Sequence, residues 1–298
     1  HVLPLLGGHF AGGEDLAFQL AADLGGSAVL TSDSFSRGRL ALDSFGEAWG
    51  WVRGGDASAW KALMVSQSLG RKLVLTQKSG SWIWQNLEAL NDCLEKDCGA
   101  NTSSSEKLFV GSESLVGCSW HPPSLWVGLG CERNTSLSLV KRALIDVFSC
   151  SDLALEAVAG LATIDIKFDE KAFISLSQER GWPIRFFSAD ELSKVKVPNP
   201  SQLVEAEIGS QSVAEAAAFL AAKNPVKLKQ EKKVYLSKEK GETGAVTIAI
   251  AEAKESFAPH RGELHLVGIG PGDLALLTQD ARFALSKSAA WIGYTLYL

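Results

Sequence analysis

The chain has 298 residues, 46% hydrophobic and 21% charged, which excludes an intrinsically disordered protein and predicts two or three domains of roughly 100 to 200 residues each. A formal net charge of −5 argues against a nucleic-acid partner, because nucleic-acid binding normally needs a concentrated basic face. No apolar run approaches the roughly 18 residues that span a bilayer, so no membrane partner is expected either.

The first 44 residues predict a turn, a helix and a strand of α/β type. Leucines recur at helical spacing in residues 14–24, and a short strand is expected to end near Thr31. The glycine-rich segment 7–9 precedes the helix, and glycines there let a ligand approach free backbone N–H groups. A tight turn capped by His9 explains the same residues about equally well.

Residues 45–124 predict a separate middle domain that is rich in tryptophan, and the pair Pro122-Pro123 at its end indicates a linker. The chain has five cysteines, an odd number, with no Cys-x-x-Cys pair. This cysteine usage fits a reduced cytoplasm and predicts no dedicated metal site in the protein.

Strands and helices alternate after the linker, which predicts βαβ crossovers and a mostly parallel sheet covered by helices. Strands are expected at 125–130, 158–164, 184–187 and 246–250, and helices at 136–148, 170–180 and 213–222. The Lys/Glu-rich residues 223–243 are expected to form a solvated hairpin or loop. A second linker, 255–262, precedes another strand expected at 264–269.

The loop 128–135 joins the first of these strands to its helix, at the sheet edge where α/β proteins bind ligands. Gly128 and Gly130 would let a ligand approach the backbone, and Arg133 could bind a carboxylate through two parallel hydrogen bonds. Thr135 or the serine after it could cap the helix. A plain structural turn is the alternative, and the Gly-Lys-Ser/Thr ending of a phosphate-binding loop is absent.

The strand expected at 158–164 ends in several ionisable residues. Asp165 and Lys167 would supply an acid/base group and a cation to the same cleft, next to Thr163. Asp169 is expected to cap the following helix.

Asn199 lies between two prolines, which stiffen the backbone of residues 197–201. Such a rigid turn suits a ligand contact through Asn199 and Ser201, or a plain connector.

These blocks together resemble the cobalt-precorrin-5A hydrolase family of the anaerobic cobalamin pathway. The resemblance rests on segments 7–9, 126–135, 160–167, 186–188, 197–201 and 212–217. It implies the end of an N-terminal domain at 1–44 and a C-terminal hydrolase domain at 125–254. The chain departs from the family pattern at Glu14, which would repel an anion, and at Asn134, where the family usually has Gly.

The resemblance implies opening of the δ-lactone of a cobalt-bound tetrapyrrole, with loss of acetaldehyde. We assign proton transfer to Asp165 and charge stabilisation to Lys167, with His9 as a base from across a domain cleft. The assigned substrate-binding residues are Gly128, Gly130, Arg133, Thr135, Thr163, Asn199 and Ser201. Cobalt arrives within the substrate, so the hydrolase needs no cofactor. Other enzymes of the pathway and a second copy of the chain are candidate partners.

Residues 263–298 resemble the start of a tetrapyrrole methylase that acts on precorrin-3B or its cobalt analogue. Gly268, Gly270 and Gly272 would form a turn for S-adenosylmethionine in a complete methylase domain. The chain would then be part of a bifunctional fusion, and its truncated methylase start should not methylate anything.

Two rival functions remain open. A non-catalytic tetrapyrrole carrier would need the carboxylate-binding residues but not Asp165 or Lys167. A general nucleotide-binding α/β protein would bind ATP or NAD, although the expected phosphate loop is missing.

Overall fold

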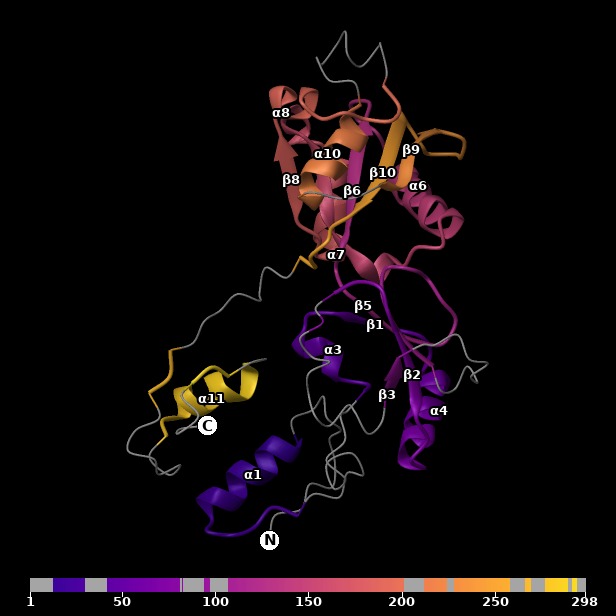
Figure 1. The fold of residues 1–298 in the computed structure, drawn as a ribbon. Coiled ribbons are helices and arrows are strands. Elements are labelled where there is room, and N and C mark those ends of the chain that lie inside the picture. Colours follow the sequence, from indigo (N-terminus) through magenta and orange to yellow (C-terminus); the bar gives the residue numbers. More distant parts are fainter. Residues whose placement is uncertain are drawn as a thin grey trace.

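The computed structural model describes residues 13–29, 42–80, 82, 94–96, 107–200, 212–223, 228–257, 266–268, 277–288 and 291–293. The described strands form two five-stranded sheets, one within residues 52–121 and the other within residues 125–252 (Figure 1). The predicted α/β class is confirmed. His9, Ser201, Gly270 and Gly272 lie outside the described residues.

The first sheet has the order β1-β5-β4-β2-β3. Its strands are β1 (Val52–Gly54), β2 (Leu73–Gln77), β3 (Leu94–Lys96), β4 (Lys107–Val110) and β5 (Cys118–His121). Neighbouring strands run parallel except β1, which is antiparallel to β5. Helices α3 (Phe45–Ala48) and α4 (Ala57–Ser68) belong to the same part of the chain.

Tryptophans fill the core of this first unit. The rings of Trp60 and Trp120 meet edge to face with centroids 5.8 Å apart, and Trp120 is fully buried. The indole nitrogen of Trp120 donates a hydrogen bond to the carbonyl oxygen of Leu42, which is also buried in this core. The core of the unit therefore begins before residue 45.

The second sheet has the order β8-β7-β6-β10-β9. Its strands are β6 (Leu125–Cys131), β7 (Val158–Ile164), β8 (Ile184–Phe187), β9 (Leu228–Leu236) and β10 (Ala245–Glu252). β6, β7 and β8 are parallel, whereas β10 is antiparallel to both β6 and β9. The sheet is therefore mixed, because the short connection from β9 to β10 can only join antiparallel strands.

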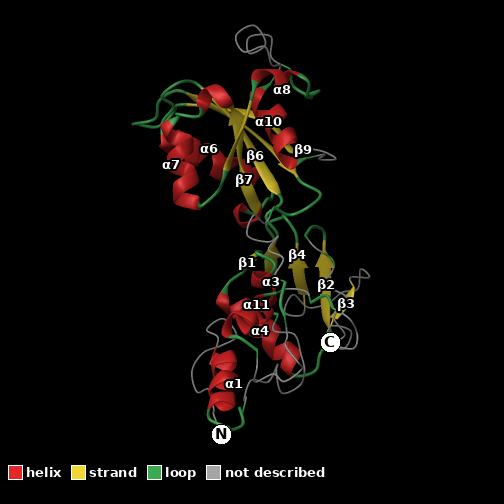
Figure 2. Ribbon diagram, turned by 90° about the vertical axis from the view of Figure 1, so that its left-hand side faces the viewer, coloured by secondary structure: helices red, strands yellow, loops and turns green. Residues whose placement is uncertain are grey.

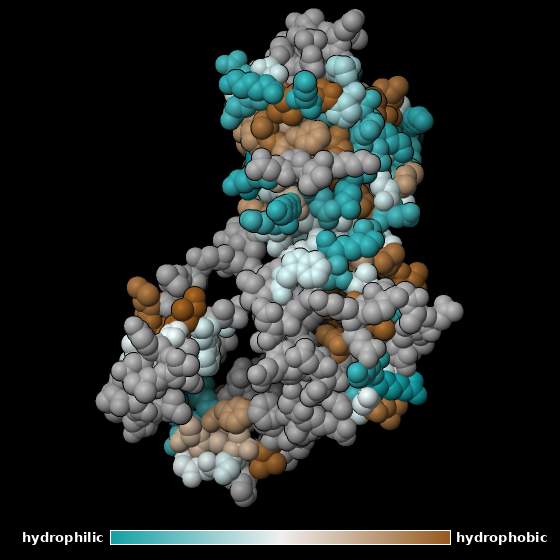
Figure 3. Space-filling view, in the orientation of Figure 1, coloured by the Kyte–Doolittle hydropathy of each residue, from teal (hydrophilic) through white to brown (hydrophobic). Residues whose placement is uncertain are grey.

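Of the two alternatives expected for residues 223–243, a solvated hairpin or a loop, the structure shows the hairpin: β9 pairs antiparallel with β10 and forms an edge strand of this sheet. Charged side chains suit an exposed edge because they discourage pairing with other chains. Figure 3 shows hydrophilic side chains gathered on the side of the sheet where β9 lies.

Helices cover both faces of the second sheet (Figure 2). α6 (Leu137–Cys150) and α7 (Lys171–Arg180) bury one core, while α8 (Ala189–Ser193) and α10 (Val213–Ala222) bury the other. α10 approaches the sheet closely, since a Cβ at Gly128 would lie 1.9 Å from the carbonyl oxygen of Ala214. Gly128 thus has a packing role on the face under α10.

The two units are joined at the Pro122-Pro123 pair between β5 and β6. Two backbone hydrogen bonds also connect them: Ser114 donates to Asp152 at 2.8 Å, and Ala154 donates to Ser112 at 2.9 Å. The segment after α6 is therefore tied to the first unit by backbone contacts as well as by the linker.

Two further helices are described, α1 (Gly13–Asp23), close to the expected 14–24, and α11 (Gln279–Lys287). The expected strand at 264–269 is not found in its described part, because residues 266–268 form no strand. Among the described residues, none of the helices has both the length and the apolar character of a membrane crossing.

Candidate functional site

The carboxyl ends of β6 and β7 meet at one edge of the second sheet, because the two strands are parallel neighbours with Gly128 beside Ala162. β7 leads directly into a 3-10 turn, Asp165–Lys167, and α7 starts soon after it. Ligands of open α/β sheets bind at edges of this kind.

Arg133 reaches from the loop after β6 to the turn after β7. Its guanidinium donates to the carboxylate of Asp169 at 2.5 Å and to the carbonyl oxygen of Ile166 at 2.6 Å. The hydrogen bond from Arg133 and its positive charge hold the pKa of Asp169 below its usual range. Both side chains are more than half exposed, and exposed ion pairs are weak because water screens them, so a ligand carboxylate can compete for Arg133.

The expectation that Asp169 caps α7 is wrong. The N-cap residue is Glu170, and Asp169 pairs with Arg133 instead. Its sequence position next to the helix fitted a cap, but the nearby guanidinium on another loop competes for the carboxylate.

The two threonines of the predicted site are buried and donate to backbone carbonyls. Thr135 donates to Glu132 at 2.8 Å, and Thr163 donates to Leu129 at 2.7 Å. Ser136, rather than Thr135, caps α6 by accepting a hydrogen bond from a backbone N–H. Thr163 therefore ties the end of β7 to β6, and Thr135 holds the loop after β6, also reaching the carbonyl oxygen of Ala245 at the start of β10 at 3.2 Å. A substrate contact for either threonine stays a prediction.

Asn134 has a φ of 59°, in the left-handed region, where asparagine is tolerated better than most residues. This conformation explains how Asn can stand where the resembled family usually has Gly.

The turn after β7 separates its ionisable residues by burial. Asp165 is exposed, whereas Lys167 is 8% exposed and Glu170 is 4% exposed. The sequence placed Glu170 among the ionisable residues that follow this strand but assigned it no role. Its burial is visible only in the structure.

Cys131 ends β6 beside these charges. The pKa of its thiol is raised to about 11, mainly by burial and also by the charge of Glu170, while Lys167, Thr135 and Arg133 act in the opposite direction. Cys131 is half-buried as a residue.

We expect iodoacetamide to alkylate Cys131 slowly near neutral pH, because only the thiolate reacts. With a pKa of about 11, the rate at about pH 8 should be about a hundredfold below that of a thiol of ordinary pKa, and should rise about tenfold per pH unit. Peptide mass spectrometry can follow Cys131 against the exposed Cys150 in the same chain. Equal rates for both thiols would contradict the expectation.

Asn199 belongs to a hydrogen-bond network around Glu215, a fully buried carboxylate in the first turn of α10. Glu215 accepts hydrogen bonds from the side-chain amide and backbone N–H of Asn199, at 2.9 and 3.1 Å, and from the backbone N–H of Lys232 at 2.9 Å. The Lys232 ammonium donates to the carbonyl oxygen of Asn199 at 2.7 Å. These contacts fit the connector role of residues 197–201.

The structure brings Arg133, Thr135, Thr163 and Lys167 to the edge formed by β6 and β7, and Asp165 to the turn beside them. Asn199 is held on the α10 face, whereas Cys131 packs against the core under α6 and α7. Gly130 is half-buried on the α10 side, near Val213.

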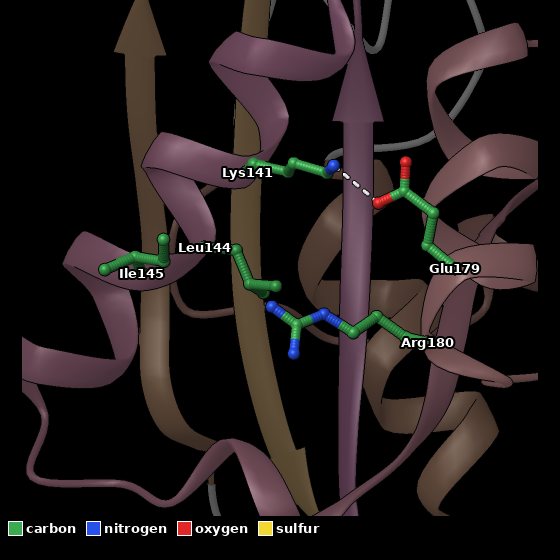
Figure 4. Close-up of a pocket in the computed structure, with 5 residues that line it drawn as sticks. All are labelled: Lys141, Leu144, Ile145, Glu179 and Arg180. Atoms are coloured by element: carbon green, nitrogen blue, oxygen red, sulfur yellow. Dashed lines mark ion pairs between the residues drawn. The ribbon is translucent and has the colours of Figure 1, made fainter.

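A cavity of about 300 Å³ lies between α6 and α7, away from the predicted site residues (Figure 4). Lys141 and Glu179 form an ion pair of 2.5 Å across it. The remaining lining residues are Leu144, Ile145 and Arg180.

Comparison with known proteins points to the cobalamin pathway. Residues 125–251 match the family model "Cobalamin synthesis G C-terminus". The chain is 26% identical to the cobalt-precorrin-5A hydrolase of Priestia megaterium over 236 residues, which cover 74% of this chain and 62% of the relative. It is 35% identical to Protein CobE of a Sinorhizobium species over 105 residues, covering 33% of this chain and 65% of the relative.

The chain is also similar to a crystal structure of CobE, which is described as a protein from the cobalamin biosynthetic pathway. The two sequences are 29% identical, the TM-score is 0.38, and the match covers 44% of this chain and 92% of the CobE chain. The chain spans less than two thirds of the length of the curated relatives named above. The family model and the curated relatives show similarity to proteins of cobalamin synthesis over the parts of the chain that they cover.

Proposed function

We propose that this protein acts in cobalamin biosynthesis by opening the δ-lactone of cobalt-precorrin-5A, with release of acetaldehyde. The observation that carries the proposal is the placement of Lys167 and Arg133 at the carboxyl edge of β6 and β7, inside the segment that matches the cobalamin family model. The similarity to a cobalt-precorrin-5A hydrolase supports the choice of substrate.

The surface of this edge also suits a macrocycle that has an apolar face and a rim of carboxylates. Ile166, Phe168 and Phe186 are 49%, 67% and 41% exposed, although they are large and apolar. Phe186 pairs in register with Thr163, so it lies at the same edge as the charged residues. Clustered exposed apolar side chains often mark binding surfaces.

Lactone hydrolysis needs a base for the attacking water, a charge partner for the oxyanion and a proton for the leaving group. In this proposal Lys167 stabilises the oxyanion and Asp165 takes part in proton transfer. Arg133 binds a peripheral carboxylate, and Thr135 and Asn199 stay predicted contacts. The role proposed for His9 rests on sequence alone.

The test is to mix the full chain with cobalt-precorrin-5A and to measure acetaldehyde. We expect one acetaldehyde for each substrate molecule consumed, over many turnovers of the protein. Heat-denatured protein should release none. Tight binding without acetaldehyde would contradict hydrolysis and favour the carrier function.

A start of a tetrapyrrole methylase at 263–298 also stays a proposal, supported by its glycine motif. Only Gly268 of the three motif glycines is described, and it is exposed, so the described residues do not assemble a site for S-adenosylmethionine. The complete methylase would supply the methyl-transfer chemistry.

A further inference from the structure

Lys167 and Glu170 are buried charges that the protein itself leaves unpaired. They are 8% and 4% exposed, yet in the described structure neither side chain makes a hydrogen bond or an ion pair. Charged side chains are almost never buried to this extent without partners, because desolvation is costly. A buried polar group without a partner therefore requires an explanation.

The charged ends of both side chains are nearly, but not fully, sealed from solvent. Neither the Lys167 ammonium nor the Glu170 carboxylate is among the completely sealed polar atoms that lack a partner.

Cys131 lies at the same edge of the sheet as the two charges, because it ends β6 and the parallel neighbour β7 leads into the turn that holds them. The backbone N–H of Glu170 donates to the carbonyl oxygen of Lys167 at 3.1 Å, so the two residues are close in space. The thiol responds to both, since Lys167 lowers its pKa and Glu170 raises it, and Arg133 adds a weaker effect from the loop after β6. The three side chains come from three different elements. Cys131 ends β6, Lys167 ends the turn after β7, and Glu170 is the N-cap residue of α7. In the described structure the ammonium of Lys167 and the carboxylate of Glu170 are not paired with each other, so each can take a ligand group as its partner.

We propose that Lys167, Glu170 and Cys131 line a site for a lactone or ester carbonyl and its attacking water. This inference rests on the proposed function and adds a residue to it. A group between an ammonium and a carboxylate must offer an acceptor to one and a donor to the other, and a carbonyl oxygen with an adjacent water offers both. Glu170 is better placed for this role than Asp165, which is exposed.

The reaction at this site is balanced without a further reactant. The water oxygen bonds to the carbonyl carbon while Glu170 takes a water proton, and the carbonyl electron pair moves to the oxygen beside Lys167. When the C=O bond re-forms, the ring C–O bond breaks. Glu170 then returns its proton to the leaving alkoxide, which gives an acid and an alcohol. Acetaldehyde forms in a later step, when the alcohol loses its O–H proton, the C–C bond to the macrocycle breaks and a proton returns to the macrocycle carbon.

The first test compares Glu170→Gln with the parent in acetaldehyde release. We expect kcat to fall by at least about a hundredfold, as for loss of a general base, with KM changed by less than about threefold. Glu179→Gln on α7 is the matched control, since its partly exposed carboxylate pairs with Lys141 instead, and it should keep the parent rate. An unchanged kcat in a folded Glu170→Gln variant overturns the inference.

The second test does not depend on turnover. Glu170→Gln should move the pH profile of Cys131 alkylation to lower pH, Lys167→Met should move it to higher pH, and Cys150 should not respond. Cobalt-precorrin-5A should protect Cys131 from iodoacetamide and leave Cys150 reactive. Unchanged profiles, or no protection by bound substrate, overturn the site.

The two proposals can fail separately. A parent chain that binds cobalt-precorrin-5A without releasing acetaldehyde contradicts hydrolysis, while protection of Cys131 would still support the binding site. Acetaldehyde release without protection of Cys131 supports hydrolysis and overturns the site.

Discussion

Replacing Lys167 with Met is expected to lower kcat for acetaldehyde release by about 100-fold to 1000-fold, the usual effect of removing one group that stabilises an oxyanion. Lys167 is 8% exposed, so its ammonium acts where water screens charge poorly. Met keeps most of the length and packing of the lysine stem, so the fold should persist. The loss should therefore appear in kcat rather than in stability.

The measurement is steady-state acetaldehyde release by the full chain, together with the urea midpoint of each variant. Lys141→Met is the matched control, because Lys141 is also a lysine of this domain but pairs with Glu179 across another cavity. A Lys167→Met chain that turns over at the parent rate would place charge stabilisation on another residue.

Replacing Glu215 with Leu is expected to destabilise the second unit by about 3 kcal/mol or more, one of the largest effects of any single substitution in this chain. Glu215 is fully buried and accepts three hydrogen bonds, two of them from backbone N–H groups of Asn199 and Lys232. Leucine fills similar space but leaves these donors unpaired. The turn at residues 197–200 and the start of β9 would lose their common partner.

Urea unfolding, followed by the fluorescence of the parent and the variant, measures this effect. Glu231→Gln is the control, because Glu231 is exposed and accepts a single hydrogen bond of 3.1 Å from the same Asn199 amide. We expect that change to cost less than about 1 kcal/mol. Similar midpoints for Glu215→Leu and the parent would show that the network does not hold the turn.

Local patterns located most elements of the second unit. β7, β8 and α10 have the bounds that periodicity predicted, and α6, α7 and β6 differ by one or two residues. These elements are bounded by short-range signals, such as the Ser136 cap of α6 and Gly181, which ends α7 with a φ of 67°. For β9 the sequence left a hairpin and a loop as alternatives, because a charged edge strand depends on its neighbour β10 rather than on its own hydrophobicity.

Some residues of the candidate site could also be located from local patterns, and others could not. Arg133, Asp165 and Lys167 were found because they follow buried strands in the sequence, and parallel strands bring their carboxyl ends to one edge. Glu170 was placed in the same ionisable cluster but given no role, since nothing local distinguishes its buried carboxylate from the exposed one of Asp165. Gly128 was interpreted as a ligand contact, yet its Cβ position is occupied by the backbone of α10.

The amino-acid sequence by itself determined where most helices and strands of residues 125–252 lie, and that their polar ends would gather at one sheet edge, because caps and periodicity act over a few residues. Only the tertiary structure decided that the sheet is mixed, that Glu215 holds Asn199, and that Lys167 and Glu170 are buried without partners. Burial and pairing depend on residues that are distant in the chain, and desolvation of a charge is set by everything packed around it.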